Sequence, residues 1–320
     1  MRVPRVAVVG VGHMGTFHLE KIRELERRGE ARLAGLLDTD PARAGAASSR
    51  FEVPAFSGIE ALAEAADAAC LAVPTVDHAE VGLSLLRAGL DLLVEKPIAA
   101  TRSEARRLIE VARERDRRLQ IGQVERFSHA FRSIEPILNR PRFIEAHRIG
   151  PFPDRATDVG VVLDLMIHDL DIVCSLAGSE VVHVEAIGVP VLSRTEDIAN
   201  ARIHFANGCV LNLTASRVSA EPMRKIRLFQ SDAYISIDFL AQSVTIIRRE
   251  GEPGGPLPPR ISGEKLDLDR EDALLEQDAA FVRAVRAGSP PPVSGEDGYR
   301  ALDLALRIQE SLPSLAELRG

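Results

Sequence analysis

The sequence predicts an α/β protein with an N-terminal doubly wound parallel sheet and a C-terminal α+β domain built on a large, mostly antiparallel open sheet. The chain has 320 residues, too many for one ordinary hydrophobic core and suitable for two domains. Up to about Gln120, short apolar runs alternate with helical stretches, as a parallel sheet covered by helices requires. Beyond about Arg126, longer alternating segments are typical of antiparallel strands with one exposed face. We therefore expect one domain at residues 1–122 and a second at residues 123–320.

The first domain is expected to contain six strands joined by helices. Each strand is a short apolar run, and each helix is an amphipathic stretch between two such runs. The strands are predicted at Val6–Val9, Leu33–Leu37, Val53–Phe56 (the weakest), Ala69–Val73, Leu90–Val94 and Leu119–Ile121. The helices are predicted at Met14–Arg28, Pro41–Arg50, Ile59–Ala65, His78–Ala88 and Ser103–Arg117.

The second domain is expected to be a sheet followed by two helices. Asn207-Gly208 predicts a hairpin with a type I′ turn, which needs positive φ at both central residues. Gly251–Pro259 is rich in Gly and Pro and is expected to be a surface loop. The closing helices are predicted at Glu271–Ala287 and Gly295–Ser311. The strands are predicted at Phe143–Ile149, Val181–Val189, Ala199–Phe205, Val210–Ser216, Ile226–Phe229, Tyr234–Phe239 and Val244–Arg248.

The composition is that of a globular protein, with 45% hydrophobic and 27% charged residues. The net charge of −7 argues against nucleic acid or an anionic membrane surface as a partner. The 3 cysteines lack the spacing of a zinc site or a redox pair, so we expect reduced thiols and a cytoplasmic protein. The first apolar segment stops at Gly10, which is too short for a signal sequence or a membrane span.

Gly10-Val11-Gly12-His13-Met14-Gly15 follows a predicted strand and opens a predicted helix, the context in which this pattern indicates a dinucleotide-binding Rossmann fold. Its glycines allow a tight turn, backbone approach to a pyrophosphate and close helix–strand packing. Asp38 ends the next strand, where a carboxylate binds the ribose hydroxyls of NAD and repels the 2′-phosphate of NADP. The alternative is an ordinary turn aspartate before Asp40-Pro41. Because the nearest following arginine, Arg43, comes only in the next helix, we predict NAD as the cofactor.

Glu95-Lys96-Pro97 follows the apolar run Asp91–Val94, which is predicted to be a buried strand. A lysine at the carboxyl end of a parallel strand faces the crevice in which open α/β sheets bind ligands. Its ammonium would then lie where a substrate hydroxyl meets a nicotinamide. We therefore predict Lys96 as a catalytic residue.

Asp164 and His168 lie four residues apart in an apolar helical segment and are expected to share one helix face. A carboxylate orients a histidine and stabilises its imidazolium form, as a general base for alcohol oxidation needs. The alternative is a helix-surface ion pair, which is common and weak. The other histidines do not have metal-ligand spacing with His168, and there is no Gly-x-Ser-x-Gly elbow, so a metal site and a serine hydrolase are not predicted.

Taken together, these motifs resemble the glucose-fructose oxidoreductase and inositol dehydrogenase family, Gfo/Idh/MocA, over nearly the whole chain. The marks are the glycine loop with His18, Val73-Pro74-Thr75 with His78, Glu95-Lys96-Pro97, Asp164 with His168, and Gly295–Gly298 before the last helix. The resemblance implies that Lys96 contacts the reacting hydroxyl, that His168 is the catalytic acid/base and that Asp164 assists it or binds substrate. It also implies a cofactor site that includes Pro74, Thr75, His78, Glu95 and Pro97, with Lys96 and His168 facing the nicotinamide across one cleft.

Within the family, Gly122–Phe127 and Asp158–His168 most resemble a branch that acts at C3 of UDP-N-acetylglucosamine and related nucleotide sugars. Such a substrate needs cations for its diphosphate, and guanidinium groups bind phosphate oxygens in pairs. The loop Gly150–Val159, just before the catalytic segment, could close over that diphosphate. The candidate arginines are Arg126, Arg148, Arg155 and Arg217, each of which could equally be a surface ion pair.

Two functional classes remain open on the sequence. The first is an NAD-dependent dehydrogenase of a nucleotide sugar, or of a free sugar or polyol. The second is a dinucleotide-binding regulator that kept the fold and lost the chemistry, which the presence of Lys96, Asp164 and His168 makes less favoured. A broad, half-exposed antiparallel sheet is also a natural oligomer surface, so we expect a homodimer or homotetramer formed through the second domain.

Overall fold

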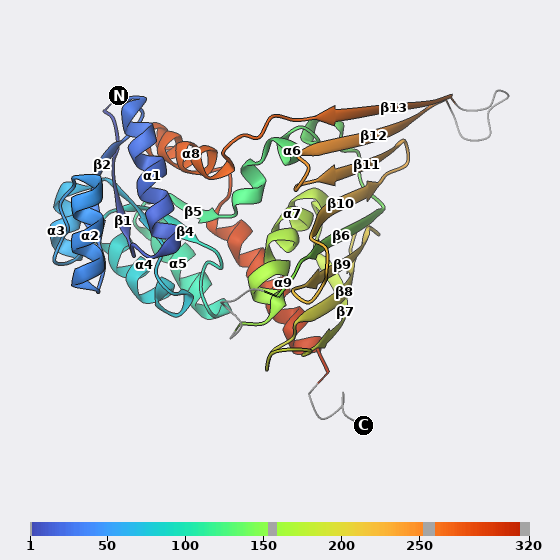
Figure 1. Cartoon of the computed structure of the whole chain (residues 1–320), viewed down its shortest axis with the longest axis horizontal. Coiled ribbons are helices and arrows are strands. Elements are labelled where there is room, and N and C mark those ends of the chain that lie inside the picture. The colour runs from blue at the N-terminus through green and yellow to red at the C-terminus, as the bar shows by residue number, and fades with distance from the viewer. Residues whose placement is uncertain (1, 153–158, 252–259, 314–320) are drawn as a thin grey trace. The chain divides into compact units, whose positions relative to one another are not determined.

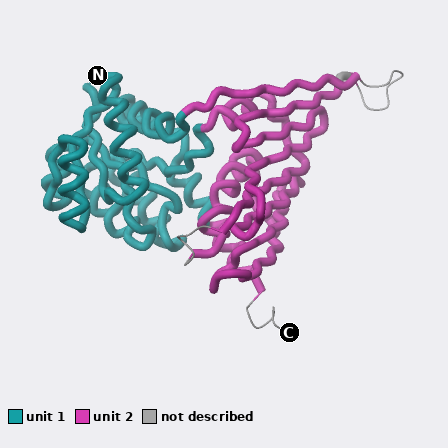
Figure 2. Tube along the Cα trace, viewed as in Figure 1, with its two compact units in different colours: residues 1–127, 272–302 teal, residues 128–271, 303–320 magenta. Residues whose placement is uncertain are grey.

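The computed structural model describes residues 2–152, 159–251 and 260–313. It divides the chain into two compact units, one of residues 1–127 with 272–302 and the other of residues 128–271 with 303–320 (Figure 2). Residues 272–302 therefore pack with the N-terminal unit, although they follow the second sheet in sequence. The division into a cofactor domain and a substrate domain after Gly122 stays a prediction.

The first unit contains a five-stranded parallel sheet in the order β2-β1-β3-β4-β5, which confirms the predicted doubly wound sheet. The strand order reverses between β1 and β3. In open α/β sheets, ligands bind at the carboxyl ends of the strands beside such a reversal. The strands are β1 (Arg5–Val9), β2 (Arg32–Leu37), β3 (Ala68–Leu71), β4 (Asp91–Glu95) and β5 (Leu119–Gly122).

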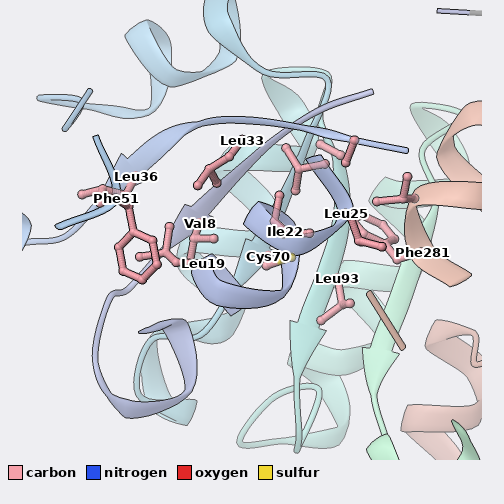
Figure 3. Packing of buried hydrophobic residues seen from close by; sticks show 14 of the residues in the cluster. Val8, Leu19, Ile22, Leu25, Leu33, Leu36, Phe51, Cys70, Leu93 and Phe281 are labelled. Atoms are coloured by element: carbon pink, nitrogen blue, oxygen red, sulfur yellow. The ribbon is translucent and has the colours of Figure 1, made fainter. Parts of the chain in front are cut away.

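Helices cover this sheet and close its core. Leu19, Ile22 and Leu25 of the first helix pack with Cys70 of β3 and with Phe281 of a late helix, so the core joins the two ends of the chain (Figure 3). Burial of these apolar side chains is the main stabilising contribution. The helices are α1 (His13–Arg27), α2 (Pro41–Phe51), α3 (Ile59–Ala65), η1 (Thr75–Asp77), α4 (His78–Arg87), α5 (Arg102–Glu114), η2 (Val124–Phe127) and α8 (Ala273–Ala287).

Two expectations for the first sheet are wrong in detail. Val53–Phe56 is not a strand: it makes a single parallel bridge, between Ala55 and Leu36. Pro54 has no N–H to donate, which keeps this pairing short. The third strand ends at Leu71 rather than Val73. On one side its neighbour β1 ends at Val9 and the chain turns at Gly10, where φ is +82°, so β3 loses the partner on that side beyond Leu71.

The second unit contains an eight-stranded sheet in the order β13-β12-β11-β10-β6-β9-β8-β7. Every neighbouring pair is antiparallel except β6 and β9, which confirms the mostly antiparallel sheet. The strands are β6 (Phe143–Ile149), β7 (Val181–Val189), β8 (Ile198–Phe205), β9 (Val210–Ser216), β10 (Met223–Phe229), β11 (Ala233–Asp238), β12 (Ser243–Glu250) and β13 (Arg260–Asp267).

The hairpin predicted at Asn207-Gly208 is present between β8 and β9, but the prediction of a type I′ turn is wrong. Gly208 has a φ of +83°, whereas Asn207 is not among the residues with positive φ. The Gly208 N–H donates to the Phe205 carbonyl at 2.9 Å, and the Phe205 N–H donates to the Cys209 carbonyl at 2.9 Å. This pattern fits a three-residue loop, in which an ordinary turn is followed by one left-handed glycine.

Helices lie against one face of the eight-stranded sheet, with α7 beside β6 (Figure 1). The segment that carries Asp164 and His168 begins with a π-helical stretch and continues as α7, a change of helix type that was not predicted. Among the described residues, no helix has the length and apolar character that a membrane span requires. The helices are α6 (His129–Arg132), η3 (Glu135–Ile137), η4 (Val162–Met166), α7 (Ile167–Ala177) and α9 (Gly295–Ser311), the last of which continues from the first unit into the second.

Candidate functional site

The glycine loop has the backbone geometry that a dinucleotide-binding turn requires. A Cβ on Gly10 would lie 2.8 Å from the backbone of Ala72, and a Cβ on Gly15 would lie 1.8 Å from the Gly10 carbonyl oxygen. Only glycine permits both close approaches. Gly12, in contrast, borders open space, because nothing lies within 4 Å of the position that a Cβ would take.

Gly12 also precedes the first turn of α1, whose N-terminus has no side-chain cap. The N–H groups of a first helical turn point along the axis and, with the helix dipole, favour an anion at such an end. The predicted cofactor residues His13 and Met14 are both exposed on this turn, and the His13 ring lies 4.7 Å from the exposed Phe17 ring. The open backbone at Gly12 and the uncapped helix therefore fit the pyrophosphate of a dinucleotide.

Asp38 follows β2 and is held against the same loop. One carboxylate oxygen accepts a hydrogen bond from the Val11 N–H at 2.8 Å, and the other accepts one from the Asp40 N–H at 2.8 Å. A carboxylate has further lone pairs, so ribose hydroxyls can still donate to it. Arg43 of α2 lies 3.5 Å from Asp38, closer than its place in the sequence indicated.

Lys96 follows directly on β4, and its side chain is half-buried at the carboxyl end of the parallel sheet. The preceding Glu95 is buried, and one of its oxygens accepts a hydrogen bond from the Lys96 backbone N–H at 3.3 Å. The peptide between Lys96 and Pro97 is cis. The strand end therefore places a lysine where the sequence predicts it, with a buried carboxylate immediately behind it.

His78 and its neighbours lie beside the segment that follows β4. The His78 ring is buried, with Nδ1 2.8 Å from the Pro97 carbonyl oxygen and Nε2 2.9 Å from the Val73 carbonyl oxygen. Burial lowers the pKa of His78. Its ring thus ties together the loops that follow β3 and β4. Pro74 is exposed and Thr75 is half-buried, in a short 3-10 turn just before His78.

His18 was marked on the sequence only as part of the family pattern, and the structure places it behind Glu95. Its Nε2 lies 3.0 Å from a Glu95 oxygen, and its Nδ1 lies 2.9 Å from a carboxylate oxygen of Asp278 in α8. Burial alone would lower the pKa of His18, but its interactions with Asp278 and Cys70 outweigh burial and raise that pKa well above its usual value. The His18 ring therefore lies between two carboxyl groups, one on β4 and one on α8.

In the second unit, Asp164 lies in the π-helical stretch η4 and His168 in the first turn of α7, and both side chains are half-buried. The start of this segment is shaped by Glu196, whose carbonyl accepts the Val161 N–H at 3.1 Å. A Cβ on Gly160 would lie 2.0 Å from the Glu196 carboxylate, so a side chain here would displace that carboxylate. The predicted pair thus lies on one helical segment with a tightly packed start.

Two of the four predicted substrate arginines are buried in ion pairs of the second unit. Arg148 of β6 donates to both oxygens of Asp169, at 2.7 and 3.1 Å, and so holds α7 on the sheet. Arg217 donates to Asp197 at 2.7 Å and to the Val159 carbonyl at 2.7 Å. Both guanidinium groups therefore have structural partners, and the sequence could not reveal them because the carboxylates lie about twenty positions away.

The other two predicted arginines are Arg126, which the structure describes, and Arg155. Arg126 lies in η2 of the first unit and is half-buried. Burial raises the pKa of Asp297, but hydrogen bonds from Ser294 outweigh burial, and the nearby charge of Arg126 helps them to lower that pKa. Arg155 lies outside the described residues, as does most of the loop predicted to close over a diphosphate.

The chain is similar to known proteins over nearly its whole length. Residues 4–123 match the family model described as "Oxidoreductase family, NAD-binding Rossmann fold", and residues 112–236 match the "GFO/IDH/MocA C-terminal domain". The UDP-N-acetylglucosamine 3-dehydrogenase of Acidithiobacillus ferrooxidans is 36% identical over 314 residues, with 98% of each chain covered. A solved structure of that enzyme has a TM-score of 0.90 to this chain, with 98% of each chain covered. The myo-inositol 2-dehydrogenase of Thermotoga maritima is 26% identical, with 96% of each chain covered.

Proposed function

This chain belongs to the GFO/IDH/MocA family of NAD-binding oxidoreductases, and from that membership we propose that it oxidises C3 of UDP-N-acetylglucosamine. The observation that carries the proposal is the 36% identity to a UDP-N-acetylglucosamine 3-dehydrogenase, which extends over 98% of both chains. A likeness confined to the dinucleotide-binding part would support only the cofactor. Because this one extends over both halves of the chain, including the half that we expect to bind substrate, it also favours the same substrate class.

In this proposal three residues act on the sugar hydroxyl that is oxidised. His168 takes the proton of the C3 hydroxyl, and Asp164 orients the imidazole or binds the sugar. Lys96 hydrogen-bonds the reacting oxygen and stabilises the negative charge that develops as the proton leaves. NAD, when bound, accepts the hydride from C3, so the product is a 3-keto sugar.

The first unit holds the cofactor in this proposal. The α1 N-terminus and the open backbone at Gly12 bind the pyrophosphate, while Asp38 accepts hydrogen bonds from the adenosine ribose. Gly10 and Gly15 keep the loop close to β3 and to α1. His13, Met14, Pro74, Thr75, His78, Glu95 and Pro97 complete the proposed cofactor site.

Arg126 and Arg155 are the arginines that we propose for the diphosphate. Charge-assisted contacts far from the reacting carbon fix the sugar in place, so a free sugar should react poorly. We leave Arg148 and Arg217 out of this role, because buried carboxylates already engage their guanidinium groups.

A second candidate is a free sugar or polyol dehydrogenase, which the 26% identity to a myo-inositol 2-dehydrogenase favours. The test that separates the two compares NAD reduction with UDP-N-acetylglucosamine, myo-inositol and glucose. Our proposal expects turnover of the nucleotide sugar and little or none of the others. Brisk turnover of a free polyol with none of the nucleotide sugar would favour the second candidate.

We also propose a cytoplasmic homodimer or homotetramer formed through the eight-stranded sheet. The support is a row of paired side chains that crosses four strands: Phe143, Phe229, Tyr234 and Ile247. The Phe229 ring lies 5.6 Å from that of Phe143 and 5.1 Å from that of Tyr234, and Phe229 and Ile247 are 38% and 41% exposed. Covering such a row with a second copy would remove apolar surface from water.

A further inference from the structure

A buried chain of ionisable groups runs through the first unit and ends at Lys96. Asp278 of α8 contacts His18 of α1 at 2.9 Å, and His18 contacts Glu95 of β4 at 3.0 Å. Glu95 then accepts the Lys96 backbone N–H at 3.3 Å. The His18 and Asp278 side chains are fully buried, and that of Glu95 is 11% exposed.

Burying these ionisable groups is costly to stability, which suggests that they serve a purpose other than stability. Ionisable groups in a protein interior are destabilising unless they are paired. Even when they are paired, hydrophobic residues of similar volume often give equal or greater stability. Cys70 of β3 also contacts His18, and burial raises the pKa of this thiol to about 11, so it stays neutral. The acidic side chains that contact the imidazole thus come from two different elements, β4 and α8.

Glu95 is restrained from a third direction as well. A Cβ on Gly122, its partner in β5, would lie 2.5 Å from the Glu95 carboxylate. The side chain therefore packs directly on the bare backbone of β5. With His18 on one side and Gly122 on another, this carboxylate has little freedom to move.

We propose that His18 is a positioning residue, which with Asp278 holds Glu95 and thereby sets the Lys96 backbone at the orientation that catalysis requires. The inference rests on the function proposed above for Lys96. A side chain that stabilises a transition state must be held within a fraction of an ångström, so loss of its support lowers turnover more than binding.

A metal site is the competing interpretation, because His18, Cys70 and Asp278 have ligand atoms that lie within 4.8 Å of one another. Both ring nitrogens of His18, however, already contact carboxylates at hydrogen-bond distances. A histidine bound to a metal uses one nitrogen for the ion. Metal analysis of the purified protein tests this directly: a stoichiometric ion removed by His18→Gln would overturn the positioning role.

The main experiment measures kcat, KM for the sugar and Kd for NAD in His18→Gln, with Ile22→Val as the matched control. Ile22 is buried one turn further along α1, and its apolar side chain can make no hydrogen bond or ion pair with the carboxylates. We expect His18→Gln to lower kcat by about 10- to 100-fold, with changes of less than about threefold in KM and Kd. Ile22→Val should leave all three unchanged. Equal kcat in His18→Gln and the parent would overturn the proposal.

A double-substitution test separates this inference from the proposed function. If His18 acts through Lys96, adding His18→Gln to Lys96→Ala should lower kcat no further. An undiminished effect of His18→Gln in that background would overturn the positioning role and leave the role of Lys96 intact. Parent-like turnover of Lys96→Ala alone would instead sink the proposed function of Lys96.

Discussion

Lys96 is the residue on which the proposed chemistry depends most. Lys96→Ala should lower kcat by about 100-fold or more, because the ammonium interacts most strongly with the oxygen as its proton leaves. The Kd for NAD should change far less, since the proposed pyrophosphate and ribose contacts lie at other residues. Steady-state kinetics and NAD titration measure both, with exposed Lys265→Ala as the control. An undiminished rate in Lys96→Ala contradicts the assignment.

Asp197 gives a residue-scale prediction for stability and pH. Burial alone would raise the pKa of Asp197, but hydrogen bonds from Ser193 and Arg217 outweigh it and hold the pKa well below its usual value. Asp197→Asn leaves the Arg217 charge buried without its partner and should cost about 3 to 5 kcal/mol of unfolding free energy. The exposed pair of Lys265 and Asp267 supplies the control, Asp267→Asn, with an expected loss under about 1 kcal/mol.

The pH dependence of this effect has a definite sign. A carboxylate with a lowered folded pKa stabilises the protein above its unfolded pKa, and that contribution is lost as the pH falls through the folded value. The difference in unfolding free energy between the parent and Asp197→Asn should therefore be largest near neutral pH and should shrink progressively as the pH falls below about 4. Urea unfolding at a series of pH values measures this, and a gap that widens in acid is the opposite of what we expect.

At the scale of elements, the loop before α1 separates cofactor binding from folding. Gly12→Ala should weaken NAD binding by about tenfold or more, because a methyl group would fill the space proposed for the pyrophosphate. Unfolding free energy should hardly change, since nothing lies within 4 Å of that Cβ. The control is Gly45→Ala in α2, which also has open space and should stabilise the fold by about 0.5 to 1 kcal/mol without affecting NAD. Unchanged NAD affinity in Gly12→Ala would place the pyrophosphate elsewhere.

Elements with a strong apolar period could be predicted from the sequence, and elements without one could not. The five buried strands of the first sheet are short apolar runs, which locates them within a few residues. The strand β13 was missed because almost all of its side chains are exposed, so it has no apolar face to detect. The π-helical stretch η4 was read as ordinary α-helix, since the apolar spacing of Val162–Met166 does not distinguish the two.

In the candidate site, residues that follow strands could be predicted from the sequence, whereas contacts between distant segments could not. The loop, Asp38 and Lys96 were predicted because each follows a strand, and chain position alone brings such residues to one edge of a parallel sheet. The contact between His18 and Asp278 joins residues that are 260 positions apart, and only the packing of α8 against α1 creates it. No local pattern in the sequence could have indicated that pair.

At the scale of the whole molecule, the row of side chains on the eight-stranded sheet should decide the oligomeric state. Phe229→Asp places a charge in the middle of this row and should convert the proposed oligomer to monomers, because burying an unpaired carboxylate is costly. The control is Leu240→Asp in the turn after β11, where exposure is 37% against 38% for Phe229. Light scattering measures the mass, and an oligomer that survives Phe229→Asp would move the interface to another surface.

The most direct test of the proposed function follows one hydrogen atom. UDP-N-acetylglucosamine deuterated at C3 is incubated with the protein and NAD, and both products are analysed by mass spectrometry. The proposed reaction passes the C3 hydrogen to the cofactor as hydride, so it predicts deuterated NADH and a keto sugar that has lost its label. Unlabelled NADH together with a sugar that keeps its deuterium would contradict oxidation at C3.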